Sequence, residues 1–315
     1  MINRVLGRGA APEADCPASW GCTLPFFKAG GLLLQVLAVW ILISPVFVAE
    51  AGAETDGASA GGLPDCIVRY EKGFVNWTTG EVVALGHAQP EDRREISIES
   101  LPGAARADAN SRIISVLKQV RIHGTRTVGQ YASDNDIILA GIEKTARDAV
   151  VTRQHYTSAL SIEIRLAASL YGGFLQLVLP EQIRGIPRIR PFTASPDTPE
   201  GYSRFTGLII DARGLGVVPE LMPRILSEQG HEVYSPVFIS REFAVQNGVC
   251  RYALSLERAR QIQRLGAAPL VIKGLRKEGS GHSAVVISML DYHTLEKVVE
   301  RHGFFRECRV ALVID

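Results

Sequence analysis

The chain has 315 residues, of which 46% are hydrophobic and 21% are charged, and its formal net charge at pH 7 is +1. This composition is typical of a globular protein and excludes a disordered or fibrous chain. The balance of charge also excludes a global electrostatic field that would recruit nucleic acid or an acidic membrane surface.

An apolar segment without any charged residue runs from 29 to 49, with Lys28 before it. Alternating alanines follow, which gives cleavage sites before Gly52 or Glu54. We predict that residues 1–53 are a signal peptide with a long amino-terminal region, and that the rest is exported to the periplasm or the outer membrane. Because about 20 apolar residues can span a bilayer, an inner-membrane anchor formed by residues 29–49 stays open as the alternative.

Cleavage would leave three cysteines, Cys66, Cys250 and Cys308. An odd number leaves their disulfide pairing open in an oxidising compartment. No cysteine ends the apolar segment in the context of a lipoprotein, so lipid anchoring is disfavoured. The absence of a C-x-x-C motif gives no support to thioredoxin-like chemistry or to a cysteine-rich zinc site.

The first part of the exported chain mixes strands with helices. A flexible leader at 54–66 precedes elements that follow the rules of apolar periodicity. The expected elements are a strand at 74–84, helices at 101–120 and 136–150, a hairpin of 149–156 with the alternating strand around 160–166, and a short closing element at 172–179.

Two details of these helices carry structural expectations. The apolar stripe of the first helix begins with Ala105 and Ala109, so this helix should lie close against a neighbouring sheet. Ser133 and Asp136 resemble a capping box before the second helix, with aspartate in place of glutamate.

A proline-rich stretch separates the two parts of the exported chain. Five prolines lie close together here: Pro180, Pro187, Pro191, Pro196 and Pro199. Neither a helix nor a central strand tolerates this density. We therefore predict a domain at 67–180, an exposed linker at 181–203 and a second domain at 204–315.

The second part again mixes short strands and helices. The expected strands are Leu208–Ile210, two within 222–234, one each around 270–272 and 285–287, and a terminal one at 310–314; the expected helices are 241–246, 254–265 and 292–301. Both parts contain hairpins and packed helices. This pattern favours two small α+β domains over a doubly wound sheet.

The segment from Gly207 to Gly216 is the first candidate for chemistry, because an apolar strand ends there in a glycine-containing turn. The strand should be central in its sheet, with Asp211 and Arg213 emerging at its end. The third glycine of a dinucleotide-binding turn is missing, and prolines that follow forbid the helix whose amino end would hold a phosphate. We expect Asp211 and Arg213 to pair with each other or to bind turn amides.

No catalytic constellation is evident elsewhere. The seven histidines are dispersed without the spacing of a zinc site. No G-x-S-x-G motif occurs. Glu242, beside the expected helix cap Ser240, is a third binding candidate together with Asp211 and Arg213. We therefore predict no catalytic residues, no metal, no cofactor and no enzymatic activity.

Several phrases together resemble a group of uncharacterised secreted bacterial proteins. They are Asn76–Gly80, the alanine-rich Ala104–Asn110, Phe205–Gly214, Pro223–Ile225, Glu232–Tyr234 and Ser240–Glu242. The first half of that group is similar to the small outer-membrane lipoprotein (Lpp-twenty-like) family and to the amino-terminal domain of the flagellar protein FlgT. The chain departs from the lipoproteins in lacking the lipidation cysteine.

The resemblance implies an envelope protein without catalysis, since relatives such as FlgP and FlgT build rings or discs around the flagellar motor. We accordingly predict a structural or assembly protein that binds envelope proteins or itself, with no nucleic-acid partner and with membrane contact only if the signal segment is uncleaved. A ligand-binding protein or hydrolase that uses the turn from Asp211 to Gly216 is the alternative. An exposed strand edge would favour the first class, and a deep pocket that holds Asp211, Arg213 and Glu242 would favour the second.

Overall fold

The computed structural model describes residues 62–90, 100–157, 161–179, 205–279, 284–299 and 303–315. All of them belong to one compact unit that spans residues 55–315. Its helices and sheets confirm the predicted α+β class. The expectations for the signal peptide at 1–53 and for the linker at 181–203 concern residues outside the described ranges. Within those ranges, no helix combines the length and the apolar character that crossing a membrane requires.

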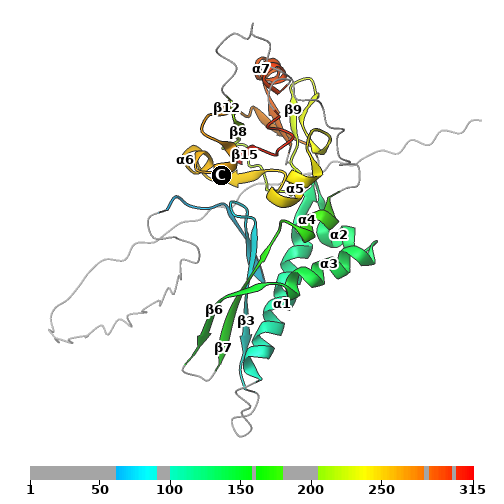
Figure 1. Ribbon diagram of the computed structural model, residues 1–315, viewed down its shortest axis with the longest axis vertical. Helices are drawn as coiled ribbons and strands as arrows, with labels where there is room; N and C mark the ends of the chain where they lie inside the picture. The colour runs from blue at the N-terminus through cyan, green and yellow to red at the C-terminus, as the bar shows by residue number, and fades with distance from the viewer. Residues whose placement is uncertain (1–61, 91–99, 158–160, 180–204, 280–283, 300–302) are drawn as a thin grey trace, which may run out of the picture. The chain divides into compact units, whose positions relative to one another are not determined.

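The first half is built on a five-stranded antiparallel sheet with the order β1-β2-β3-β7-β6 (Figure 1). Its strands are β1 (Ile67–Tyr70), β2 (Gly73–Asn76), β3 (Glu81–Ala88), β7 (Ile162–Ser169) and β6 (Val150–Tyr156). The hairpin of β6 and β7 is the one that the alternating pattern predicts. A short ladder of β4 (Arg121–His123) and β5 (Arg126–Thr127) lies apart from this sheet.

Helix α1 (Leu101–Gln119) covers one face of the sheet and packs on β3 and β7. A Cβ atom on Gly86 of β3 would overlap the carbonyl oxygen of Ala105 and the amide nitrogen of Ala109. Both alanines are fully buried. The prediction that the alanine stripe lies close against a sheet is therefore confirmed, and a glycine on the sheet completes the close approach.

Three shorter helices complete the first half. They are α2 (Val128–Ala132), α3 (Asp136–Arg147) and α4 (Gly173–Val178). The predicted capping box at Ser133 was wrong, because the side chain of Asn135 caps α3 by accepting a hydrogen bond from the amide of Ile137. A capping box does occur one helix earlier, where Thr127 and Gln130 bind each other's backbone amides at the start of α2.

The single strand expected at 74–84 is in fact two strands, β2 and β3, joined by a tight turn. The Asn76 side chain accepts hydrogen bonds from the amides of Thr78 and Thr79, and Gly80 has a φ of +80°. An asparagine that binds amides two and three residues ahead competes with the extended conformation. The aromatic and β-branched residues of the turn conceal this signal in the sequence.

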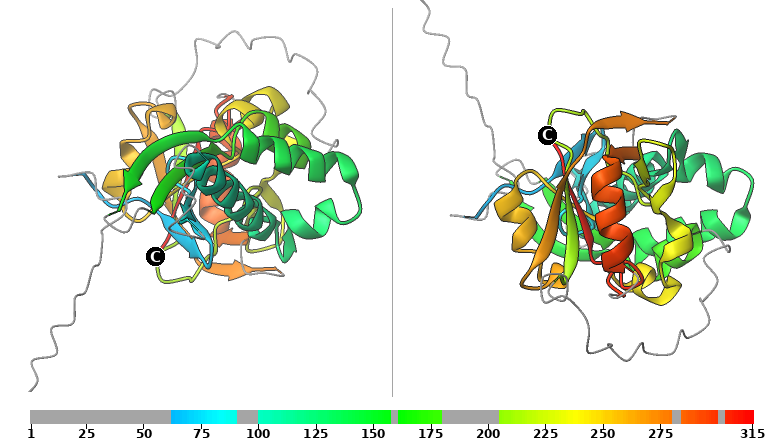
Figure 2. Two further views of the ribbon diagram at one scale, coloured as in Figure 1. Left: turned by 90° about the horizontal axis from the view of Figure 1, so that it is seen from below. Right: turned by 90° about the horizontal axis from the view of Figure 1, so that it is seen from above.

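The second half contains two four-stranded sheets, with the orders β11-β15-β8-β12 and β10-β9-β14-β13. Their strands are β8 (Gly207–Asp211), β9 (Ile225–Ser227), β10 (Glu232–Tyr234), β11 (Arg251–Ala253), β12 (Pro269–Lys273), β13 (Arg276–Glu278), β14 (Ala284–Ile287) and β15 (Val310–Val313). The helical elements are η1 (Pro236–Phe238), α5 (Arg241–Asn247), α6 (Leu256–Arg260), η2 (Gln263–Leu265) and α7 (Met289–Val299). Helix α7 contacts β10 and is seen along its length in Figure 2.

Strand β8 lies between β15 and β12, which confirms that the apolar run Leu208–Ile210 is central in its sheet. All pairings of this first sheet are parallel. The sequence pattern of short hairpins did not predict a parallel sheet, because the strands that pair here are separated by long stretches of chain.

The two halves share one cluster of buried apolar residues and are joined by hydrogen bonds. The Thr78 hydroxyl donates to the carbonyl of Tyr252 at 2.9 Å, and the Gly124 amide donates to the carboxylate of the buried Glu220 at 2.7 Å. The partly buried Arg251 guanidinium stacks on Tyr171 and donates to its hydroxyl. The two halves thus share a core. Their division into independent domains at 67–180 and 204–315 stays a prediction.

Candidate functional site

The turn after β8 places Asp211 and Arg213 together, as expected. The Arg213 guanidinium donates two hydrogen bonds to the Asp211 carboxylate, at 2.8 and 2.7 Å. These hydrogen bonds lower the pKa of the Asp211 carboxyl. The Asp211 side chain is 20% exposed and the Arg213 side chain 44% exposed, so the pair is open to solvent.

The backbone amide of Gly214 in this turn is hydrogen-bonded to a carboxylate of the same chain. The Gly214 amide, where φ is +79°, donates to both carboxylate oxygens of Asp315 at 2.8 and 2.9 Å. A backbone amide in this position is what an anionic ligand would use. The polar groups of the turn are therefore bonded to one another.

The third candidate, Glu242, lies elsewhere. It is an exposed residue in the first turn of α5. No hydrogen bond or ion pair between described residues joins it to Asp211 or Arg213. The structure thus brings two of the three candidates together and leaves the third apart.

The cysteines are placed as interior residues. Cys66, Cys250 and Cys308 are buried, free thiols. Burial raises the pKa of Cys66 and of Cys250 to about 12 and that of Cys308 to about 11, which makes the reactive thiolate scarce at neutral pH. Across the part of the chain that the structure describes, no three His, Cys, Asp or Glu side chains gather as metal ligands would.

Strand β6 is an exposed edge strand of the first sheet. It is the last strand in the sheet order, so among the described strands it pairs with β7 alone. All seven of its residues are exposed, including Val150 at 67%, Val151 at 38% and Tyr156 at 52%. An exposed edge of this kind presents unpaired backbone groups beside apolar side chains.

The exposure of β6 follows from where the helical layer ends. Its partner β7 alternates between buried and exposed residues, and the buried ones face α1. Val151 lies directly opposite Leu166, which is fully buried, yet Val151 itself is open to solvent. The apolar side of β6 therefore extends beyond the helices that cover the rest of the sheet.

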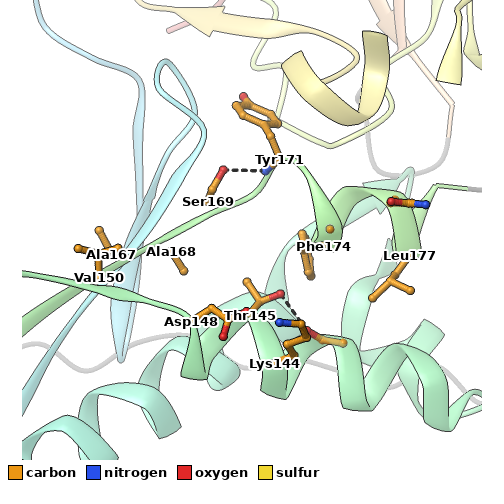
Figure 3. Close-up of a pocket in the computed structure, with 13 residues that line it drawn as sticks. Lys144, Thr145, Asp148, Val150, Ala167, Ala168, Ser169, Tyr171, Phe174 and Leu177 are labelled. Carbon is orange, nitrogen blue, oxygen red and sulfur yellow. Dashed lines mark hydrogen bonds and ion pairs between the residues drawn. The ribbon is translucent and has the colours of Figure 1, made fainter. Parts of the chain in front are cut away.

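A pocket of about 680 Å³ adjoins the start of β6 (Figure 3). It lies between α3, α4 and the end of β7, and its walls are mainly apolar. Lys144 and Asp148 form an ion pair on the α3 side, while Phe174 and Leu177 come from α4. None of the three candidate residues named from the sequence lines this pocket.

Sequence reasoning predicted the hairpin but missed the exposure of β6. The strand reads VVTRQHY, without the strict alternation of apolar and polar residues that marks one buried face. That irregularity is the one signal in the sequence that could have pointed to an uncovered strand.

Comparison with known protein families finds a match for the second half of the chain. Residues 207–315 match the family model described as the second domain of Treponema pallidum Tp0624. This segment begins at β8 and ends beyond β15. No curated protein matches the chain. The second half, from the central strand of the parallel sheet onward, is thus similar to that Tp0624 domain.

Proposed function

We propose that the protein is a non-catalytic structural or assembly protein of the cell envelope, and that it binds another envelope protein through the β6 edge. The observation that carries this proposal is a sheet edge whose seven residues are all exposed. An extended segment of a partner would add a strand there, with main-chain hydrogen bonds supplying affinity and alternate side chains supplying specificity.

The apolar side chains of β6 support the same proposal. Val151 and Tyr156 lie on the α1 side of the strand and Val150 on the opposite side, and burial of these large side chains against a partner would be favourable. They flank backbone groups that a partner strand would satisfy. Apolar area and unpaired ladder groups on one strand fit an interface better than they fit a surface meant to stay in solvent.

A ligand-binding or hydrolytic role for the turn at Asp211–Gly216 has less support. Its carboxylate is held by Arg213 and its glycine amide by Asp315. A thermal-shift screen of the wild type and Asp211→Asn against nucleotides, sugars and divalent metals separates the two roles. A ligand that stabilises only the wild type, while both proteins melt alike without it, would favour the enzymatic role.

Site-specific photo-crosslinking tests the interface. A photoreactive phenylalanine derivative replaces Tyr156 on β6 in the native cells, and the same derivative at Ile137 of α3, which is 69% exposed, is the control. We expect a discrete crosslinked envelope protein from position 156 and none from 137. A folded protein that gives no crosslink at 156 would contradict the proposed function.

The proposed location rests on the apolar segment before residue 50 and on the resemblance to envelope proteins. Amino-terminal sequencing of the native protein should find Gly52 or Glu54. Retention of residues 29–49 would mean an inner-membrane anchor instead. An association with flagellar or outer-membrane machinery is the narrower form of the proposal, and the identity of the protein crosslinked at position 156 would decide it.

A further inference from the structure

Strand β6 has one formally charged residue at neutral pH, the positively charged Arg153. Its sequence includes Arg153 and His155 but neither aspartate nor glutamate. Among described residues, no partner forms a hydrogen bond or an ion pair with the Arg153 side chain. The most prominent charge on the exposed edge is thus a guanidinium without a protein partner in the described chain.

The neighbouring strand adds a second guanidinium opposite the first. Arg153 faces Arg165 of β7 in the register. The Arg165 guanidinium lies over the Phe74 ring of β2 on the same face of the sheet, 5.5 Å from its centroid. Like charges directly opposite each other are unfavourable in a sheet. A carboxylate placed beside Arg153 would offset that repulsion.

The two faces of β6 differ in character. Arg153 and Arg165 share the face of Leu85, which is 46% exposed and points away from α1. Gln154 and Tyr156 lie opposite Ile164 and Ile162, which are buried on the α1 side. An added strand would therefore meet Arg153 and His155 on one face, with Glu163 of β7 opposite His155, and Gln154 and Tyr156 on the other.

The ladder available for pairing is short. A bulge lies between Val151 and Arg153, and regular pairing with β7 runs from Arg153 to Tyr156. A partner segment that follows this part of β6 would face a guanidinium, then an uncharged residue, then an imidazole, then an aromatic ring. Its complement alternates acidic and apolar residues.

We infer that β6 binds an extended segment of another protein in which acidic residues alternate with apolar ones, with an acidic side chain facing Arg153. This inference rests on the proposed function and adds the chemistry of the partner. A second copy that pairs through its own β6 does not fit, because another β6 has no carboxylate to offer Arg153 in any register.

The test uses the purified full chain and labelled peptides long enough to span β6, measured by fluorescence anisotropy at low salt. One peptide alternates glutamate and valine, and its counterpart alternates lysine and valine. We expect the glutamate peptide to bind at least about tenfold more tightly, and Arg153→Glu to reverse this preference. Arg260→Glu, an exposed arginine on α6, is the matched control and should leave the preference unchanged.

Backbone methylation separates strand addition from simple charge attraction. Two further glutamate–valine peptides carry N-methyl groups, one on its glutamates and the other on its valines. In an added strand the amides of alternate residues point to the same neighbour, so only one of the two should lose binding. Equal binding by both methylated peptides, a preference for the lysine peptide, or an unchanged preference in Arg153→Glu would overturn the inference.

The crosslink at position 156 distinguishes this inference from the proposed function. A crosslinked partner segment that is basic, or a crosslink of the chain to itself, would leave the edge as an interface and refute the acidic partner. A crosslinked segment that alternates acidic and apolar residues would support both.

Discussion

Strands β7 and β6 are neighbours in one sheet, joined by a hairpin and paired residue by residue, yet they have opposite surroundings. The inward residues of β7 are buried under α1, whereas all seven residues of β6 are exposed. Of two strands paired in one ladder, β7 thus contributes side chains to the core, whereas β6 exposes its side chains to solvent. The difference teaches that the end of the helical layer, rather than strand sequence alone, decides which residues hold the fold and which are available to a partner.

The covered side of this comparison should be the most sensitive to substitution. Gly86→Val would place side-chain atoms on the backbone of Ala105 and Ala109 in α1, and backbone cannot rotate away. We expect a loss of about 3 kcal/mol or more in the free energy of unfolding, measured with urea. Gly103→Ala in the same helix, where an added Cβ meets nothing, should leave stability equal or slightly higher. Equal behaviour of the two variants would contradict the packing described.

The paired residues Leu166 and Val151 sharpen the comparison most directly. Leu166→Ala removes buried atoms under α1 and should cost about 2–5 kcal/mol. Val151→Ala, its exposed partner in the register, should change stability by no more than about 0.5 kcal/mol. Urea denaturation of both variants measures the difference. A cost at Val151 as large as that at Leu166 would mean that β6 is covered in solution.

The turn after β8 offers a second comparison of buried and exposed residues, because this central strand ends in a partly exposed ion pair. A buried bond at Asp211 would be worth about 1–3 kcal/mol, but the pair with Arg213 is partly exposed, so Asp211→Asn should cost only about 0.2–1 kcal/mol. Because the pKa of Asp211 is lowered on folding, the advantage of the wild type should be present at neutral pH. It should disappear as the pH falls below about 4. Unfolding curves of the wild type and Asp211→Asn at neutral pH and below about pH 4 would show whether their difference in stability disappears.

The smallest effect is expected on the edge itself. Arg153→Glu removes a like charge opposite Arg165 and should raise stability by a few tenths of a kcal/mol, about 0.2–0.5, or leave it unchanged. The same variant should lose its preference for the glutamate–valine peptide. A marked loss of stability in urea denaturation would show that Arg153 serves the fold and not a partner.

The sequence predicted features that depend on local pattern. The alanines at 105 and 109 indicated close packing, and the apolar run at 208–210 indicated a central strand. The pairing of Asp211 with Arg213 also followed from their spacing within one turn.

Other features depend on contacts between distant segments and could not be predicted in this way. The carboxylate that binds Gly214 belongs to a residue 101 positions away. The exposure of β6 depends on where α1 and α3 end in space. The irregular pattern of β6 indicates an uncovered strand, but it does not indicate where those helices end.

The bond from the Thr78 hydroxyl to the Tyr252 carbonyl spans 174 positions along the chain. Contacts of such long sequence separation slow folding, because the entropy of closing a large loop is lost before the contact forms. During synthesis, the sheet that contains β3 emerges long before β11. The half of the chain that is made first therefore lacks this hydrogen bond, and its part of the shared apolar cluster lacks packing partners, until β11 has been made.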